Sequence, residues 1–547
     1  MTMPAFRRTH KPPHDSGGRL IDPPLGAMEP LVDNNRLLRA AFDTRVGDLR
    51  LWELIAATRR EILSVAAEYT SSYHDVLRPS DTADWIARPI VMGGHQPNLF
   101  HAGVWLKNFV IDAYAREVGG TAINLVVDTD RCGPPVVGVP VGSAASAQLE
   151  PVPLDAEADQ GVAMAWEERR IVDPDCFGSF GDRVCRRLEP LVAEPVLREW
   201  WPSVVERSGE AHRMGLAIAQ ARHALERRWG LETLELPVSE LMRLPTVMVL
   251  TGWLLSQTRR LHDAYNEALA DYRREHGTRG RGRPMPDLVT MPGRDDEGTW
   301  FEVPWWIWTR EDPRRRRAFA HTRPSGTVIL SDMETLRVEL PISAETSPSK
   351  WVDALSRLEE HEVRLRPRAV LTTLIARLLV ADVFVHGIGG AAYDQITDAV
   401  VRGLTGCDPP RYAVVSGTLR LPIDLPGDPQ RKLSQIHHQL RDMEFHPERY
   451  FGALETCPPE ARELAGEKWR WIETHPTPGL ARRRCHAIRD ANDRMAGFNR
   501  ARRQELLDSV GPLATAVRAR KVLASREFPW CFFPAGMLKN FLLLETS

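Results

Sequence analysis

Residues 91–110, VMGGHQPNLFHAGVWLKNFV, gather polar side chains that could bind an anion. Gly93 and Gly94 end a short apolar run and precede a segment with helical periodicity. Because glycines permit positive φ, this loop could direct its backbone amides and the N-terminus of the next helix at a phosphate or carboxylate. The alternative is a tight turn between a strand and a helix, without a ligand. The loop side chains that would surround such a ligand are His95, Gln96, Asn98 and His101.

Three charged residues could join this loop. Lys107 lies about one turn into the expected helix and could reach a phosphate as a point charge, or could be a solvated helix residue. Asp128 and Asp130 follow a second apolar run, TAINLVV, and could orient a substrate amine or hold Mg²⁺. The alternative for both is a strand-end carboxylate in water. Spacing fixes no third ligand beside the two histidines and one acid, so we expect no resident metal site.

A second strand–glycine–helix pattern occurs in VFVHGIGGAAYDQITD, residues 383–398. Its residues 387–392 match the dinucleotide fingerprint G-x-G-x-x-G/A. Such fingerprints usually open the first βαβ unit, with an acidic residue about 20 positions later, and neither condition is met here. Dinucleotide binding therefore stays an alternative to a second substrate-contacting loop. The candidate binding residues of this loop are Gly387, Gly389, Gly390, Tyr393 and Asp394.

A parallel sheet would position these residues. The runs PIVMGG and TAINLVV flank a helical segment, so we expect a βαβ unit that places residues 93–103 and 128–130 near each other at one sheet edge. The sheet is expected to resume at residues 381–401 and 411–422. Between residues 150 and 360 the sequence predicts helices separated by loops. There, EVPWWIWT indicates a strand that packs on a helix or stacks on a sugar, and EDPRRRRAF is expected to be an exposed loop.

Composition restricts the function classes. The chain has 547 residues, of which 26% are charged and 43% apolar, with a formal net charge of −2. These balanced values are typical of a soluble globular protein and argue against a nucleic-acid partner. We find no signal peptide, no apolar run long enough to span a membrane and no Cys-x-x-Cys pair among the 7 cysteines. We therefore expect a cytoplasmic protein that has no membrane partner.

Four regions are expected along the chain: an irregular leader (1–35), an α/β core with a helical preamble and insertions (36–426), a helical region (427–524) and an apolar tail (525–547) that packs back on the core. In the helical region Leu433, Ile436, Leu440 and Met443 follow 3-4-3 spacing. That seam predicts a helical hairpin or short coiled coil, through which we expect a homodimer.

Two stretches resemble the cysteine ligase (cysteine-adding enzyme) family of bacillithiol biosynthesis. GGHQPNLFHAG is similar to that family's Gly-Gln-Gln-x-Gly-Leu-Phe loop. LRPRAVLTTLIARLLVADVFVHGIGGAAYDQITD is similar to its Arg-Pro run leading to Gly-Pro-Gly-Glu-x-Ala-Tyr. The matching residues are Gly94, Gln96, Leu99, Phe100, Arg366, Pro367, Gly387, Gly389, Ala392 and Tyr393. The chain departs from the family at His95, Asn98, Gly390 and the DTDR run at 128–131.

The resemblance implies a Rossmann-like α/β core of the class shared by aminoacyl-tRNA synthetases and nucleotidylyltransferases (the HUP class), with a dimerising coiled-coil domain. It implies a ligase that joins cysteine, or a similar small molecule, to an amine-bearing acceptor such as a glucosamine–malate conjugate, with ATP or ADP and Mg²⁺ as cofactors. His95, Gln96 and His101 are then the candidate catalytic residues. The alternatives are an NAD(P)-dependent oxidoreductase that uses residues 387–392 and a non-catalytic scaffold that binds a nucleotide or metabolite.

Overall fold

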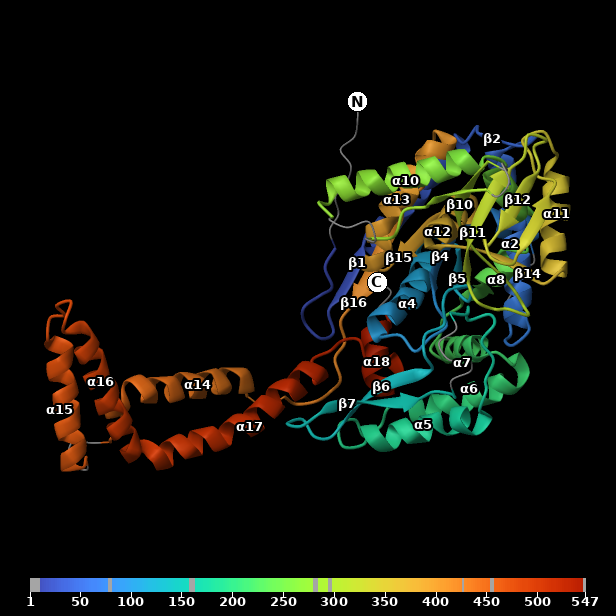
Figure 1. Cartoon of the computed structure of the whole chain (residues 1–547). Coiled ribbons are helices and arrows are strands. Elements are labelled where there is room, and N and C mark those ends of the chain that lie inside the picture. Colours follow the sequence, from blue (N-terminus) through green and yellow to red (C-terminus); the bar gives the residue numbers. More distant parts are fainter. Residues whose placement is uncertain are drawn as a thin grey trace.

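The computed structural model describes residues 10–76, 81–156, 163–278, 284–293, 298–425, 427–452 and 457–544. The chain is mixed α/β, as predicted. Figure 1 shows a body built on two larger β-sheets, with helices around them, and a helical arm that projects from one side of the body.

A six-stranded mixed sheet forms the centre of the body, in the order β1-β16-β15-β4-β5-β8. Only the edge strand β1 runs antiparallel to its neighbour, whereas the other strands pair in parallel. Taken in chain order, the parallel strands follow the 3-2-1-4-5 arrangement of doubly wound sheets, so the order reverses between β4 and β15. The strands are β1 (Arg19–Asp22), β4 (Ile90–His95), β5 (Thr121–Val126), β8 (Leu234–Pro237), β15 (Val383–His386) and β16 (Tyr412–Gly417).

Both faces of the mixed sheet are covered, which explains why its strands read as continuous apolar runs. Along β4, Ile90 and Met92 belong to one core cluster, and Val91 between them belongs to the other. The helices that contribute to the Met92 cluster are α2 (Leu51–Ser71), α9 (Pro245–Ser256), α10 (Thr258–Glu275), α11 (Pro348–Glu360), α12 (Ala369–Ile375) and α13 (Ile388–Thr405). Those on the Val91 side include α4 (Ala102–Glu117), α5 (Pro174–Leu188), α6 (Leu197–Ala211), α7 (Met214–Arg228) and α18 (Ala535–Leu542).

An antiparallel sheet, which the sequence analysis did not predict, occupies much of residues 290–367. Its order is β13-β12-β11-β10-β14, and β9 pairs with the free end of β10. The expected exposed loop at EDPRRRRAF is wrong, because β11 begins at Arg316 within that run. The strands are β9 (Thr290–Pro292), β10 (Thr299–Thr309), β11 (Arg316–Thr322), β12 (Val328–Ser331), β13 (Arg337–Leu340) and β14 (Val363–Pro367).

The N-terminal segment is also more regular than expected. Residues 1–9 lie outside the described part, but β1 and the first two turns of α1 (Met28–Ala40) fall within residues 1–35, the predicted irregular leader. β1 completes the edge of the mixed sheet against β16, and α1 buries Met28 and Val32 in the core. The local sequence, rich in proline and charged residues, did not indicate either element. Each is stabilised by contacts with distant parts of the chain.

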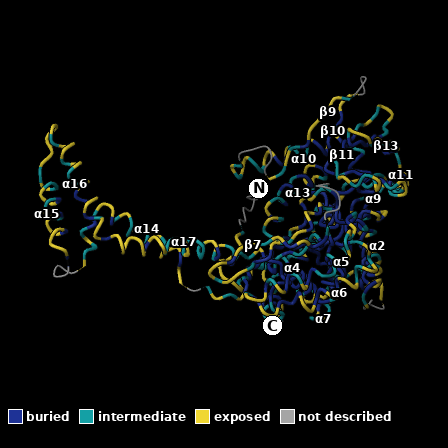
Figure 2. The backbone as a smooth tube through the Cα atoms, turned by 60° about the horizontal axis from the view of Figure 1, so that its bottom comes forward, coloured by how far each residue is buried: buried dark blue, intermediate teal, exposed yellow. Residues whose placement is uncertain are grey.

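The helical arm comprises α14 (Pro429–Phe445), α15 (Pro459–Glu473), α16 (Ala481–Ala496) and α17 (Arg500–Leu523). In Figure 1, α14 lies along α17, and α15 and α16 pair at the far end. Figure 2 shows that most of the arm backbone carries exposed or half-buried residues, unlike the body. After α17 the chain returns to the body, where Trp530, Phe532 and Phe541 are buried.

Smaller elements complete the fold. They are β2 (Arg45–Val46), β3 (Leu49–Arg50), α3 (Thr82–Ala87), the hairpin of β6 (Val136–Val141) and β7 (Gln148–Pro153), α8 (Val238–Leu241) and the π-helical turn η2 (Ala376–Val380).

The first turn of α4 packs directly on β16. A Cβ atom on Gly103 would lie 2.0 Å from the carbonyl oxygen of Gly417, so only glycine fits there. We predict that Gly103→Ala lowers the free energy of unfolding by about 1–3 kcal/mol, because α4 must move away from the sheet. Gly178→Ala is the matched helical control: its Cβ would meet nothing within 4 Å, so that variant should be neutral or slightly stabilising. Urea unfolding of both variants tests this, and equal stabilities would contradict it.

Candidate functional site

Hydrogen bonds join three separate segments at the carboxyl edge of the mixed sheet. Gln96, just after β4, donates from Nε2 to Oδ2 of Asp130, which follows β5, at 2.8 Å. Arg315, just before β11 of the antiparallel sheet, donates to the other oxygen of Asp130 at 3.2 Å. Tyr393 of α13 lies close enough that Asp130, after burial, raises the pKa of its phenol. The β4, β5 and α13 ends therefore meet beside the point where strand order reverses.

His95 ends β4 and is neutral at physiological pH. Burial, followed by the charge of nearby Lys107, lowers the pKa of His95 to about 3. Its Nδ1 donates to the carbonyl oxygen of Gln96 at 3.0 Å, and its ring packs edge-to-face on Phe100. In the neutral ring this leaves Nε2 as a hydrogen-bond acceptor. His95 can thus accept a hydrogen bond but supplies no positive charge for a phosphate.

Lys107 is a buried amine on α4, with 6% of its surface exposed. Its Nζ donates to the carbonyl oxygen of Gly94 at 2.8 Å. Within the described residues no carboxylate lies within 4.0 Å of this amine. Burial lowers the pKa of Lys107 to about 8. The side chain is therefore not a solvated helix residue; it places a cation without an acidic partner at the end of β4.

His101 has a structural role in the loop. It is the N-cap of α4, and its Nδ1 accepts a hydrogen bond from the backbone N–H of Gly103 at 3.1 Å. Its Nε2 lies 3.6 Å from a carboxylate oxygen of Glu527 in the C-terminal segment. Burial lowers the pKa of His101 despite that carboxylate. The two histidines thus have different surroundings: His95 ends the strand, and His101 begins the helix.

The glycines of the first loop do not adopt the expected conformation. Gly93 and Gly94 both lie inside β4, and neither has positive φ. A Cβ on Gly94 would lie 3.0 Å from the Cβ of Leu125, so close packing against β5 explains this glycine. The predicted convergence of their amides on an anion is wrong. Polar groups of the following loop remain available, including the buried Oδ1 of Asn98, which has no hydrogen-bond partner among the described residues.

Asp128 contacts protein groups and not solvent. Its carboxylate accepts hydrogen bonds from the backbone N–H of Ser239, at 2.9 Å, and from the Ser239 hydroxyl at the start of α8. Burial, followed by the negative charge of Glu167, raises the pKa of Asp128 to about 7. Of the two predicted acids, only Asp130 is partly exposed, with 42% of its side-chain surface accessible.

The second loop forms the N-terminus of α13. Gly387 is the N-cap, and Gly389 and Gly390 lie in the first turn. A Cβ on Gly390 would meet the ring of His386 at 2.8 Å, whereas a Cβ on Gly387 or Gly389 would meet nothing within 4 Å. Neither of these two has positive φ. The fold therefore requires glycine at 390 but not at 387 or 389, where the space beside the helix N-terminus is open.

Asp394, a predicted ligand contact, is buried in an ion cluster. Arg377 of η2 contacts Asp394 and also Asp398, the latter at 2.7 Å. His386 Nε2 lies 2.7 Å from Oδ2 of Asp394, the same carboxylate oxygen that Arg377 contacts. Burial raises the pKa of Asp394, but the charges of Arg377 and His386 hold that pKa well below its usual range. Asp394 thus anchors α13 to η2 and β15, and Tyr393 is the residue of this pair that faces Asp130.

Sequence reasoning missed the contribution of the antiparallel sheet. Trp305 and Trp308 of β10 are buried, whereas Trp306 is half-buried beside the site. The guanidinium groups of Arg315 and Arg368 lie 4.6 Å and 4.3 Å from the centre of the Trp306 ring. Alternation along EVPWWIWT did indicate that Trp306 and Trp305 face opposite ways, but no local signal links Trp306 to Asp130.

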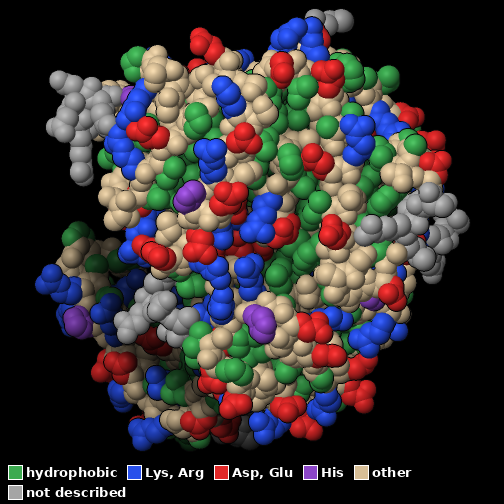
Figure 3. Space-filling view, turned by 90° about the vertical axis from the view of Figure 1, so that its right-hand side faces the viewer, with side chains coloured by type: hydrophobic (Ala, Val, Ile, Leu, Met, Phe, Trp, Pro, Cys, Tyr) green, Lys and Arg blue, Asp and Glu red, His purple; other side chains and the backbone are tan. Residues whose placement is uncertain are grey.

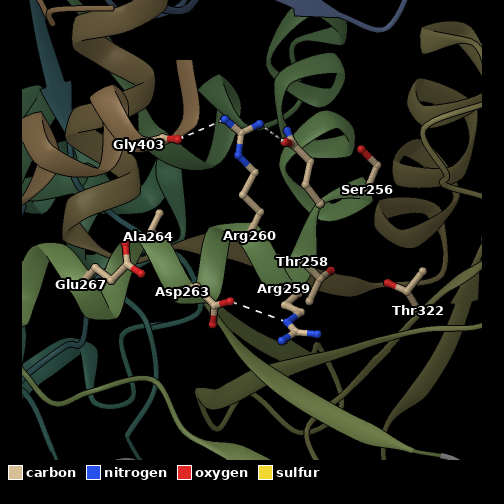
Figure 4. Close-up of a pocket in the computed structure, with 10 residues that line it drawn as sticks. Ser256, Thr258, Arg259, Arg260, Asp263, Ala264, Glu267, Thr322 and Gly403 are labelled. Atoms are coloured by element: carbon tan, nitrogen blue, oxygen red, sulfur yellow. Dashed lines mark hydrogen bonds and ion pairs between the residues drawn. The ribbon is translucent and has the colours of Figure 1, made fainter. Parts of the chain in front are cut away.

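A surface cavity of about 580 Å³ lies away from these residues. Figure 4 shows its lining, from the end of α9, the start of α10, the end of β11 and Gly403 of α13. Arg260 there donates to the carbonyl oxygens of Gly403 and Leu404, and Arg259 lies 3.7 Å from Asp263. Gly403 is near the C-terminal end of α13, about 20 Å along that helix from its glycine turn. The cavity is therefore separate from the carboxyl-edge site.

No family model matches the chain, and no curated protein matches it. Over the described ranges, no group of three or more His, Cys, Asp or Glu residues is placed to hold a metal ion. Also within those ranges, we find no helix with the length and hydropathy needed to cross a membrane.

Lys107 should make stability depend on pH. Its native pKa of about 8 lies below the ordinary value of 10.5, so the native state loses this proton first as the pH rises. Stability should therefore increase between these two pH values, by about 3 kcal/mol, because the penalty for burying the charge disappears. Lys107→Met should lack this increase.

Denaturant unfolding at several pH values between 8 and 10.5 measures the effect. The control is Lys350→Met, at an exposed position of α11, which should keep the wild-type profile. Parallel profiles for wild type and Lys107→Met would contradict the buried-cation interpretation.

Proposed function

We propose that this chain is an enzyme that binds a small anionic substrate or nucleotide at the carboxyl edge of the mixed sheet and performs a ligase-type condensation. The observation that carries the proposal is Lys107, a buried cation with no carboxylate partner among the described residues. Burying an unpaired charge is costly, and an anionic ligand at the end of β4 would compensate that cost. The hydrogen bond from Lys107 to the carbonyl oxygen of Gly94 is neutral on the acceptor side and does not compensate the charge.

The neighbouring groups suit an amine acceptor as well as an anion. His95 offers a neutral acceptor nitrogen, and Asp130 is a partly exposed carboxylate held by Gln96. An acceptor nitrogen near a carboxylate can bind a substrate amine through hydrogen bonds and orient it for attack. Together with the sequence resemblance, this favours joining cysteine or a similar small molecule to an amine-bearing acceptor, as in bacillithiol biosynthesis.

ATP or ADP is the proposed cofactor. The open N-terminus of α13 beside Gly387 and Gly389 and the Lys107 amine are groups that suit phosphates. Asp130, which is partly exposed, could supply one carboxylate ligand to Mg²⁺. The ion would therefore be bound mainly through the phosphates of the nucleotide. The nicotinamide alternative is weaker, because residues 387–392 follow the fourth parallel strand in chain order and not the first.

Calorimetry on the full chain tests the proposal. We expect ATP or ADP to bind, and Lys107→Met and Gln96→Leu each to weaken that binding roughly ten- to hundredfold, as expected for hydrogen bonds to charged groups. Gln148→Leu, at an exposed position of β7, is the matched control and should bind as the wild type does. Mixtures with cysteine and an amino-sugar conjugate then test turnover.

The alternatives give different results in the same panel. Binding of NAD(P) without any response to ATP would favour an oxidoreductase. Ligand binding without turnover in every mixture would favour a scaffold. Unchanged affinity in both site variants would refute the proposed site.

We also propose that the arm mediates homodimerisation. Phe445, Trp469, Phe498 and Leu507 expose between 37% and 54% of their surface on the arm. The predicted seam of α14 is only partly covered by α17, since Leu433, Ile436 and Leu440 are half-buried and Met443 alone is buried. Exposed apolar groups on a projecting arm are typical of an interaction site.

Light scattering should therefore give a dimer mass for the full chain at micromolar concentration. The double variant Phe445→Glu/Trp469→Glu should be monomeric with an unchanged far-ultraviolet spectrum, because both side chains already face solvent. Val205→Glu, on the body, is the control at an exposed apolar position. A monomeric wild type would contradict this proposal.

A further inference from the structure

We propose that Arg315, Arg368 and Trp306 form a second wall of the site, which binds an oxyanion of the ligand, either a carboxylate or a phosphate. This inference rests on the proposed function and specifies the chemistry of its substrate.

The arginine run 314–317 lies just before and at the start of β11, and its members divide into two sets by their partners. Arg314 makes a two-pronged ion pair with Asp312, at 2.7 Å and 2.6 Å. Arg316 contacts Asp312 at 2.8 Å and Glu334 at 2.9 Å. Arg315 instead reaches Asp130. The first set is therefore neutralised by local acids, whereas Arg315 is directed at the carboxyl edge.

The side chains of Arg315 and Arg368 are 8% and 12% exposed, and both stack on Trp306. Burial, and the positive charges of Arg368 and Arg131, lower the pKa of Arg315 although Asp130 raises it. Two like charges beside one ring repel each other, so an additional anion would stabilise the arrangement. The Nε atoms of both arginines are buried without a hydrogen-bond partner in the described residues.

The nearby carboxylates are already occupied. Asp130 accepts hydrogen bonds from Gln96, from the backbone N–H of Arg131 and from Arg315. Glu302 receives Arg368 at 2.7 Å and Arg317 at 3.4 Å. Three guanidinium groups, those of Arg315, Arg317 and Arg368, thus contact two carboxylates, which leaves an excess of positive charge. Guanidinium groups recognise carboxylates and phosphates in the same geometry, so an oxyanion is the ligand group that fits.

The geometry favours a small ligand over a nucleic acid. Side chains with about a tenth of their surface exposed cannot follow an extended polyanion. Figure 3 looks onto the side where the antiparallel sheet and α11 lie, and there Lys and Arg side chains are interspersed with Asp and Glu. A nucleic-acid surface would instead carry a continuous basic stripe.

The test measures binding of two probes, pyrophosphate and succinate, to the full chain by calorimetry. We expect at least one probe to bind the wild type, and the probe that binds identifies the oxyanion as phosphate or carboxylate. Arg315→Gln and Arg368→Gln should each weaken it roughly ten- to hundredfold. Arg314→Gln removes the same charge one residue away and should bind as the wild type does.

Other outcomes overturn the inference. It fails if neither probe binds the wild type, if Arg315→Gln and Arg368→Gln retain wild-type affinity, or if Arg314→Gln weakens binding equally. Arg315→Lys guards against a folding defect: it keeps the charge without the planar fork and should show intermediate affinity at unchanged thermal stability. If Lys107→Met loses ATP binding while Arg315→Gln keeps full affinity for the probe, the second wall is refuted. The proposed function is then still supported.

Discussion

The site depends on one buried arginine that joins the antiparallel sheet to the mixed sheet. Arg366 of β14 contacts Glu167 at 2.8 Å and 3.1 Å and also contacts Glu359 of α11. Burial opposes its charge, but the two carboxylates raise the pKa of Arg366 above its ordinary value. Removing one partner of such a buried pair typically costs about 3–5 kcal/mol. The segment that carries Glu167 also forms hydrogen bonds with the backbone of Asp130 and of Arg315. The Arg366–Glu167 ion pair therefore keeps Asp130 and Arg315 in position.

Burial, more than residue type, determines the charges at the carboxyl edge. His95 is neutral because its ring is desolvated beside Lys107, and the amine of Lys107 is held by a backbone carbonyl. Asp128, equally buried, has a pKa near neutrality, whereas the partly exposed Asp130 is surrounded by donors. A cation without a counter-charge therefore lies near a hydrogen-bond acceptor and a partly exposed carboxylate. The proposed function rests on this combination, because the cation would bind an anion and the other two groups would bind an amine.

Four strands of the mixed sheet, β4, β5, β15 and β16, could be predicted because they are apolar runs next to helical segments, and each pattern lies within about 30 residues. The edge strands β1 and β8 were not predicted. The antiparallel sheet could not be predicted, since β11 begins with Arg316 and Arg317, and a run of arginines indicates an exposed loop. Arg315 and Asp130 are separated by 185 positions, and Arg366 and Glu167 by 199. Candidate residues of the first loop were found by type, but their roles needed the structure. The sequence does not distinguish His101, a helix cap, from His95, a strand-end acceptor.

The glycines of the site fall into two sets: those that close packing requires and those that it does not explain. Gly94, Gly103 and Gly390 are each explained by an atom that a Cβ would meet. Gly387 is the N-cap of α13, where glycine is common, but Gly389 has no such neighbour and no positive φ, and glycine in a first helical turn lowers helix stability relative to alanine. Packing and backbone strain thus give no reason for glycine at 389. Close approach of a ligand to the backbone, as in the proposed function, would give one, and the phosphate contact expected at the first loop would then lie at the N-terminus of α13.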